Sequence, residues 1–172
     1  MMEAIKNDRT PNFFFMQYEL ATWRVKNLLL IPSFAFPPSA IIKRKPLSIT
    51  ARRHGWVGCN IALNRVPVEA RIPVVTESAV MPASEVREKF RRVKPLKEIS
   101  VTQRGWTLDV LNAIRRLGKT EFTTNDAYIF TRELEKLHPD NRHVRDKIRQ
   151  QLQVLRDTGL LLHIDRGVWC LP

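Results

Sequence analysis

The sequence predicts an α+β protein whose last third is a winged helix. Three observations predict this fold class. Apolar residues recur at helical spacing in three segments after residue 104, and two short apolar runs around a glycine turn close the chain. Aromatic and aliphatic runs typical of strands occupy the first third. Helix, short strand, helix, helix and hairpin is the order of elements in a winged-helix DNA-binding domain.

The segment 141–158 has the clearest pattern. One helical stripe is apolar and contains Val144, Ile148, Leu152 and Leu155. Arg, Gln and Asn side chains can form two hydrogen bonds with a base edge in the DNA major groove, which favours a recognition helix. An ordinary surface helix with a solvated outer face has the same pattern, so the sequence leaves both interpretations open. The polar face contains Arg142, Asp146, Arg149, Gln150 and Gln153.

The neighbouring elements follow from caps and breakers. Thr107 is predicted to cap a helix that Gly118 ends, and Asp140 or Asn141 to cap the third helix. The turn 165–167 places Arg166 where a wing meets the DNA backbone. The predicted elements here are a strand at 121–123, a helix at 124–137, and hairpin strands at 160–164 and 168–171.

The first hundred residues predict a sheet with short helices. The runs at 12–20 and 25–31 are almost continuously apolar, which predicts strands buried on both faces. Ser39 is predicted to cap a short basic helix that ends at Pro46. Ser84 is predicted to start a basic helix that reaches Arg92, with a linker to Gln103. Met1–Arg9 reads as the end of a helix, and 61–63 and 71–76 as further strands.

The loop at 47–60 combines basic and aromatic side chains with two glycines. Arg52, Arg53 and His54 precede Trp56, which Gly55 and Gly58 bracket. Such a loop suits phosphate contacts beside an aromatic ring that faces a base. A tryptophan that packs into a core beneath a surface loop is the alternative.

The charge favours a polyanionic partner. The chain has 172 residues and a net charge of +12. Residues 1–103 hold 17 basic and 8 acidic residues, a net +9, whereas residues 104–172 hold 12 and 9, a net +3. The apolar runs are too short to cross a bilayer and no apolar leader is present, so we expect a cytoplasmic protein. Cys59 and Cys170 are predicted to be buried thiols.

A catalytic set is missing from the sequence. Nucleases that use Mg²⁺ commonly carry Pro-Asp followed by Glu-x-Lys, and no Glu-x-Lys occurs in the chain. The single Pro-Asp, Pro139-Asp140, stands where a helix cap is expected. The four histidines, His54, His138, His143 and His163, lack metal-ligand spacing. The residues therefore predict nucleic-acid contact surfaces without a catalytic centre.

Five segments together resemble the DpnI-type methyl-directed restriction endonucleases, the Dam-replacing protein family. The resemblance implies a Mg²⁺-dependent nuclease domain of the PD-(D/E)xK kind followed by a winged helix. It also implies recognition of double-stranded GATC sites that carry N6-methyladenine, a role for Trp56 in recognising the methylated base, and a bacterial, DNA-associated protein. The matching segments are TPNFFFMQY (10–18), IIKRKPLSITARRHGWVGCNI (41–61), RGWTLDVLN (104–112), EFTTNDAYIF (121–130) and RDKIRQQLQVLRD (145–157).

The chain departs from the family pattern at its beginning. Family members carry a four-cysteine zinc site and the catalytic Asp and Glu-x-Lys before the segment that matches residues 10–18. We therefore expect an N-terminally truncated member, with a partial nuclease domain at 1–98 and a winged helix at 99–172. Zn²⁺ and Mg²⁺ are implied only for the intact enzyme, and we expect no cofactor or catalytic residue in this chain, which we expect to be a monomer.

Two functions remain open from the sequence. The chain is either the DNA-recognising part of a methyl-directed endonuclease or a complete non-catalytic regulator or reader of methylated DNA. We expect the isolated module of residues 104–172 to bind fully methylated GATC duplex preferentially. The predicted DNA-binding residues are Arg52, Arg53, Trp56, Arg104, Asn141, Arg142, His143, Arg145, Arg149, Gln150 and Arg166.

Overall fold

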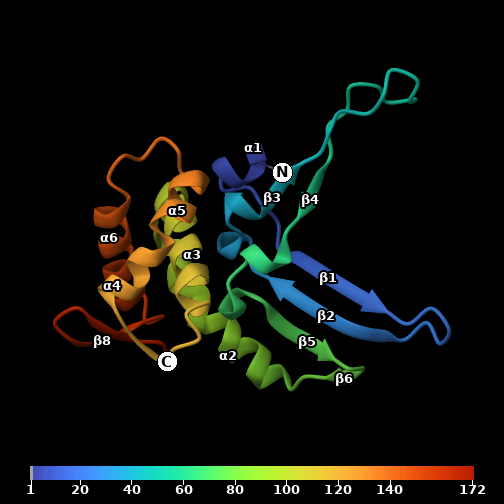
Figure 1. The fold of residues 1–172 in the computed structure, drawn as a ribbon. Helices are drawn as coiled ribbons and strands as arrows, with labels where there is room; N and C mark the ends of the chain where they lie inside the picture. Colours follow the sequence, from blue (N-terminus) through green and yellow to red (C-terminus); the bar gives the residue numbers. More distant parts are fainter. Residues whose placement is uncertain (1) are drawn as a thin grey trace.

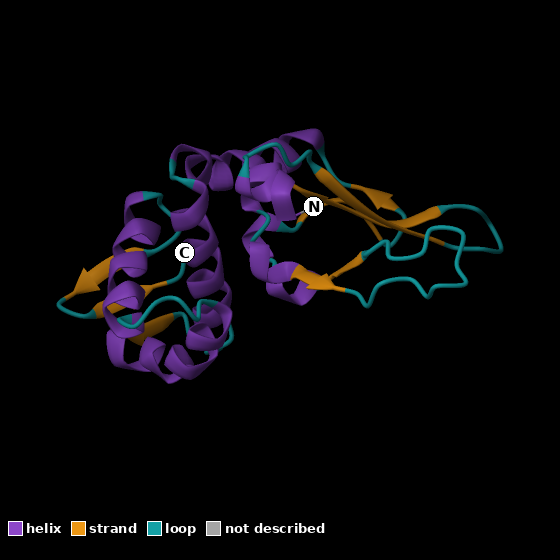
Figure 2. Ribbon diagram, turned by 90° about the horizontal axis from the view of Figure 1, so that it is seen from above, coloured by secondary structure: helices purple, strands orange, loops and turns teal. Residues whose placement is uncertain are grey.

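The computed structural model describes residues 2–172 and has the predicted mixed α and β character. Two regions lie side by side, which we call the sheet region (residues 2–98) and the winged-helix region (residues 99–172) (Figure 1). A view from above gives the same arrangement, with strands and long loops on one side and most of the helix on the other (Figure 2).

The sheet region is built around a four-stranded sheet in the order β1-β2-β5-β6. The strands are antiparallel, and Phe13 opposite Ile31 starts the register of β1 and β2. The predicted strands at 12–20, 25–31 and 71–76 are confirmed, with slightly different ends. The bounds are α1 Met2–Lys6, β1 Phe13–Tyr18, β2 Val25–Ile31, β5 Ile72–Thr76 and β6 Ala79–Val80.

Strand β1 is exposed, which corrects the prediction that both its faces are buried. It lies at the edge of the sheet, and Phe14 and Met16 are 58% and 54% exposed. Only Phe13, at its start, packs on the core, where its ring meets Phe36 edge-on at 5.9 Å between centroids. The sequence correctly predicts that this strand is apolar. Burial also requires another element to cover the strand, and no element among residues 2–172 covers most of β1.

A second hairpin, of β3 (Ile41–Lys43) and β4 (Cys59–Ile61), replaces the predicted helix between Ser39 and Pro46. Ser39 does not cap a helix, because its hydroxyl donates to the buried carboxylate of Asp109. Ile41 then pairs with Ile61 across the hairpin, and branched side chains favour such extended backbone. Short 3₁₀ turns flank the strands at Ser33–Ala35, Pro38–Ala40, Leu63–Arg65 and Val68–Ala70.

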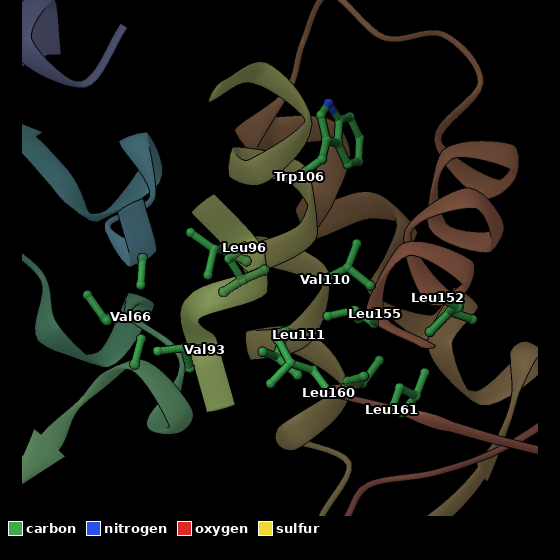
Figure 3. Packing of buried hydrophobic residues seen from close by; sticks show 14 of the residues in the cluster. Val66, Val93, Leu96, Trp106, Val110, Leu111, Leu152, Leu155, Leu160 and Leu161 are labelled. Atoms are coloured by element: carbon green, nitrogen blue, oxygen red, sulfur yellow. The ribbon is translucent and has the colours of Figure 1, made fainter. Parts of the chain in front are cut away.

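Helix α2 (Ala83–Val93) and a 3₁₀ segment (Lys94–Glu98) lead to the winged-helix region. Pro82 occupies the N-cap without a side-chain hydrogen bond, so the predicted cap at Ser84 is wrong. The stretch before Gln103 is more ordered than a linker, because Val93 and Leu96 are fully buried between the regions (Figure 3).

The winged-helix region has the predicted order of elements. Its three-stranded sheet has the order β7-β9-β8 and lies beside the helices. Gly118, Gly159 and Gly167 have positive φ and lie where a helix or strand ends. The bounds are α3 Val101–Arg115, β7 Glu121–Thr123, α4 Thr124–Ala127, α5 Thr131–Leu137, α6 Val144–Asp157, β8 Leu162–Asp165 and β9 Val168–Cys170. A 3₁₀ turn at Tyr128–Phe130 divides the predicted second helix into α4 and α5.

Two helix starts differ from the prediction. Helix α3 begins at Val101, where the Ser100 hydroxyl accepts the Gln103 N–H at 3.4 Å, so Thr107 lies inside the helix. Helix α6 begins at Val144 after His143, which makes no side-chain cap bond, so neither Asp140 nor Asn141 is the cap. The side-chain oxygen Oδ1 of Asn141 instead accepts the backbone N–H of His143 at 2.8 Å, in the turn before the helix.

A single apolar core joins the two regions. Leu96 from the 3₁₀ segment, Leu111 from α3 and Leu155 from α6 belong to the same cluster of buried side chains (Figure 3). Burying a leucine side chain contributes roughly 1.5–3 kcal/mol. Because the cluster crosses the boundary, the position of α6 is coupled to the sheet region through α3.

Candidate DNA-binding surface

Helix α6 has one buried and one exposed face, as its sequence pattern predicts. Val144, Ile148, Leu152 and Leu155 are almost fully buried, and they fix the helix against the core. The opposite face leaves its polar side chains free to meet a partner. The exposed side chains of the helix are Arg145, Asp146, Arg149, Gln150, Gln153, Arg156 and Asp157, and the exposed Arg142 and His143 lie just before it.

Two contacts organise the exposed face of α6. The Arg145 guanidinium carbon lies 5.2 Å from the centre of the Tyr128 ring, which steadies that side chain against the 3₁₀ turn between α4 and α5. Lys147 Nζ donates to Gln150 Oε1 at 2.7 Å. Arg149 makes no side-chain hydrogen bond or ion pair within residues 2–172, so its five donors are available to a base or phosphate.

Gln151 is a polar residue on the buried face of α6. Its side chain is fully buried, and Oε1 accepts the Thr107 hydroxyl at 2.7 Å. The same hydroxyl lies 2.9 Å from the Gln103 carbonyl one turn back in α3. A buried polar contact is specific in geometry, so this pair fixes the register of α6 against α3.

The β8–β9 hairpin forms a wing with Arg166 at its turn. Arg166 is exposed, and its backbone N–H donates to the Asp165 carboxylate at 2.6 Å. Trp169 anchors the wing, since its indole N–H donates to the Thr124 hydroxyl at 2.9 Å. The wing therefore presents Arg166 on a hairpin attached to the start of α4.

The loop of the β3–β4 hairpin presents Trp56, which is 49% exposed rather than packed into the core. The Arg53 guanidinium carbon lies 5.1 Å from the centre of the Trp56 rings, and Arg52 is also exposed. An ideal Cβ on Gly58 would lie 2.9 Å from the Trp56 ring, so only glycine leaves room for this position of the indole. The loop thus combines an accessible aromatic face with two arginines.

The predicted DNA-binding residues form two separate surfaces. Helix α6 and the wing lie at one end of the molecule, and the loop with Trp56 projects from the other, in both views (Figures 1 and 2). The structure brings Arg142, Arg145, Arg149 and Gln150 together, but it does not bring them near Arg52, Arg53 and Trp56.

Arg104 belongs to neither surface, which corrects its prediction as a DNA contact. It is only 6% exposed, and Nη1 donates to the Asp8 carboxylate at 2.8 Å. Nη2 donates to the Ile99 carbonyl at 3.0 Å. The hydrogen bond from Arg104 holds the pKa of Asp8 below its usual range. Arg104 therefore connects the end of α1 to α3.

Sequence reasoning missed several surface features. Leu162 and Ile164 are exposed apolar side chains on the wing, and Lys147 lies at the margin of the polar face of α6. Helical spacing alone could have placed Lys147 there. Cys59 is exposed rather than buried, because β4 is a hairpin strand with only one neighbour.

Metal-ligating side chains do not cluster in the described part of the chain. Within residues 2–172, no group of three His, Cys, Asp or Glu residues has the geometry to hold a metal ion. The described residues therefore supply no ligand set for the zinc and magnesium that the resemblance implies for the intact enzyme. Separately, no helix among these residues has the length and apolarity needed to cross a membrane.

A third helix with an exposed Arg- and Gln-rich face, followed by a two-stranded wing, defines a helix-turn-helix protein with DNA as its partner. Comparison with family models agrees with this class. Residues 1–99 match the Dam-replacing family (DpnI), and residues 102–170 match the Dam-replacing HTH domain. The chain belongs to the Dam-replacing family.

Proposed function

We propose that α6 enters the major groove of GATC sites that carry N6-methyladenine, and that the chain is the DNA-recognising part of a methyl-directed double-strand endonuclease. The observation that carries this proposal is the exposed face with Arg145, Arg149 and Gln150 on a helix locked by a buried stripe. Arg and Gln are the side chains that read guanine and adenine edges in that groove. Asn141, Arg142 and His143 lie just before the helix and extend the same face.

The expected preference for methylated DNA is moderate. Burying one methyl-sized group contributes about 0.8 kcal/mol, which corresponds to roughly fourfold in affinity. Two methyl groups, one per strand, give roughly fifteenfold if their contributions add. Trp56 offers a second, planar apolar surface, and we propose that it gives the sheet region its own contact with the methylated base.

We further propose that residues 1–98 belong to a nuclease domain of the PD-(D/E)xK kind and residues 99–172 to the winged helix. The family match of residues 1–99 supports this division. No group of three metal-ligating side chains occurs within residues 2–172, and we assign no metal-dependent step to this chain. We expect no cleavage when the purified chain is incubated with methylated plasmid and Mg²⁺.

The binding proposal is best tested with the whole chain, since α3 begins before residue 104 and packs on the sheet region. Fluorescence anisotropy at fixed salt would compare fully methylated, hemimethylated and unmethylated GATC duplexes. We expect roughly fifteenfold tighter binding of the fully methylated duplex than of the unmethylated one. Arg149→Ala should cost about 1–3 kcal/mol for specific DNA, whereas Arg91→Ala, an exposed arginine on α2, should cost much less.

Two results would change the proposal. Equal affinity for methylated and unmethylated duplexes would remove the methyl preference and leave a winged-helix regulator that binds DNA without reading methylation. Equal losses in the Arg149 and Arg91 variants would reassign α6 to nonspecific phosphate attraction.

A further inference from the structure

A cleft of about 650 Å³ lies between the two regions, outside the surfaces described above. The 3₁₀ turns of the sheet region form one wall, and the end of α3 with α5 forms the other. No residue of α6, the wing or the Trp56 loop lines it, as far as residues 2–172 show. Its polar lining consists mainly of Arg65, Arg71, Arg115, Arg116, Asn64 and Asn112.

Two of the four arginines have acidic partners. Arg115 forms an ion pair with Glu69, whose side chain is almost fully buried. Arg116 bonds Glu133 at 2.7 Å, and its guanidinium lies 4.9 Å from the centre of the Phe130 ring. These contacts hold both guanidinium groups in place, and they cancel two of the four positive charges.

Arg65 and Arg71 retain uncompensated charge. Arg65 Nη1 donates to the Ser39 carbonyl at 2.7 Å, which orients the side chain but does not neutralise it. Arg71 has no carboxylate partner within residues 2–172, and its Nε is buried without a hydrogen-bond acceptor there. An unmatched buried donor is unfavourable, so this N–H would be stabilised by an acceptor that reaches it.

We propose that this cleft binds a phosphate group. A phosphate carries one to two negative charges and several acceptor oxygens, which match the net charge of +2 and the free donors of Arg65 and Arg71. The planar fork of arginine suits two-point contact with phosphate oxygens. The phosphate comes either from the DNA backbone or from a free nucleotide. The inference does not rest on the proposed methyl-dependent reading, because none of the residues involved is shared.

Inorganic pyrophosphate is a suitable probe, followed by NMR of arginine Nε–Hε signals in the whole ¹⁵N-labelled chain. The Arg71 signal is assigned by its loss in Arg71→Gln. We expect a saturable shift of this signal, and a loss of at least tenfold in affinity in Arg65→Gln. Arg87→Gln, which removes an exposed arginine of α2 outside the cleft, should bind pyrophosphate as wild type does. The proposal is overturned if pyrophosphate causes no saturable shift of the Arg71 signal, or if Arg65→Gln and Arg87→Gln lose the same affinity for pyrophosphate.

A second experiment, which measures DNA binding at several salt concentrations, distinguishes the two sources of phosphate. If the cleft holds the DNA backbone, Arg71→Gln lowers the slope of log K against log salt by about 0.9, the value for one phosphate contact. If the slope is unchanged while pyrophosphate still binds, the site serves a free phosphate ligand. Loss of methyl preference in α6 variants leaves the pyrophosphate result intact, so failure of the proposed function and failure of this site are distinguishable.

Discussion

Gly58 controls the position of the aromatic side chain on the second surface. The missing Cβ leaves room for the Trp56 ring, and Arg53 lies over the same indole. The basic and aromatic character of this loop, which motivates its proposed role in DNA binding, follows from composition alone. The contact between Arg53 and Trp56 does not, because a three-residue separation brings two side chains together only in a particular turn.

Gly58→Ala should therefore weaken DNA binding without unfolding the protein. The added methyl group displaces the indole, and contacts between an aromatic ring and a base are worth about 1–3 kcal/mol, or roughly fivefold to more than a hundredfold in affinity. Anisotropy measures the affinity, and tryptophan fluorescence reports the displacement. Asn60→Ala, on the neighbouring exposed strand, is the control. A displaced indole with unchanged affinity would remove Trp56 from the binding surface.

Helix α4 begins with a capping box, which makes the stability of this helix sensitive to acid. The Thr123 side chain accepts the Asp126 N–H, and the Asp126 carboxylate accepts the Thr123 N–H at 2.7 Å. The hydrogen bond from the Thr123 N–H, with further bonds from its hydroxyl and Lys119, lowers the pKa of Asp126 to about 2.

The stability provided by Asp126 should depend on pH in a defined window. A carboxylate whose folded pKa is depressed stabilises the fold above its ordinary value of 3.8, and this contribution is lost as pH falls toward 2. Asp126→Asn should thus lower Tm at pH 7, and the difference from wild type should shrink through this window. Thermal unfolding from pH 7 to pH 2 measures it, with Asp140→Asn as the control. A constant difference would exclude the carboxylate as the cause.

Helices could be predicted from sequence more reliably than their ends. The apolar stripe of α6 follows from spacing alone, and the structure confirms it. Thr107 had the chemistry of a cap, but its hydroxyl bonds Gln151 across the helix interface instead. Ser39 likewise binds Asp109 rather than a helix end. Such small polar residues serve either purpose, and only the tertiary partner decides between them.

Asp109 connects distant parts of the whole molecule. Its buried carboxylate accepts the Ser39 hydroxyl from the sheet region, and it bonds His138 Nε2, at the end of α5, at 2.8 Å. The His138 ring also stacks on Trp106, with centroids 3.7 Å apart. The sequence does not reveal this cluster, because its members come from three elements that only the fold brings together.

Asp109→Ala should destabilise both regions at once. It leaves the partly buried Ser39 hydroxyl and His138 ring without their partner, and an unmatched group costs about 1–3 kcal/mol when fully buried. We expect a loss of roughly 2–4 kcal/mol in the free energy of unfolding, with a single transition retained. Urea unfolding followed by fluorescence and circular dichroism measures both features. Asp157→Ala, at an exposed ion pair, should have little effect. Two separate transitions in wild type would contradict the shared core.

The exposed edge strand β1 affects how the protein behaves in concentrated solution. Phe13–Tyr18 contains no charged residue, so we expect the net charge of +12 to keep the apolar edges of different copies apart. This repulsion acts over about 8 Å at 0.15 M salt but only about 3 Å at 1 M. The high salt that releases bound DNA therefore also promotes aggregation, and a competing polyanion at moderate salt is the gentler way to remove nucleic acid.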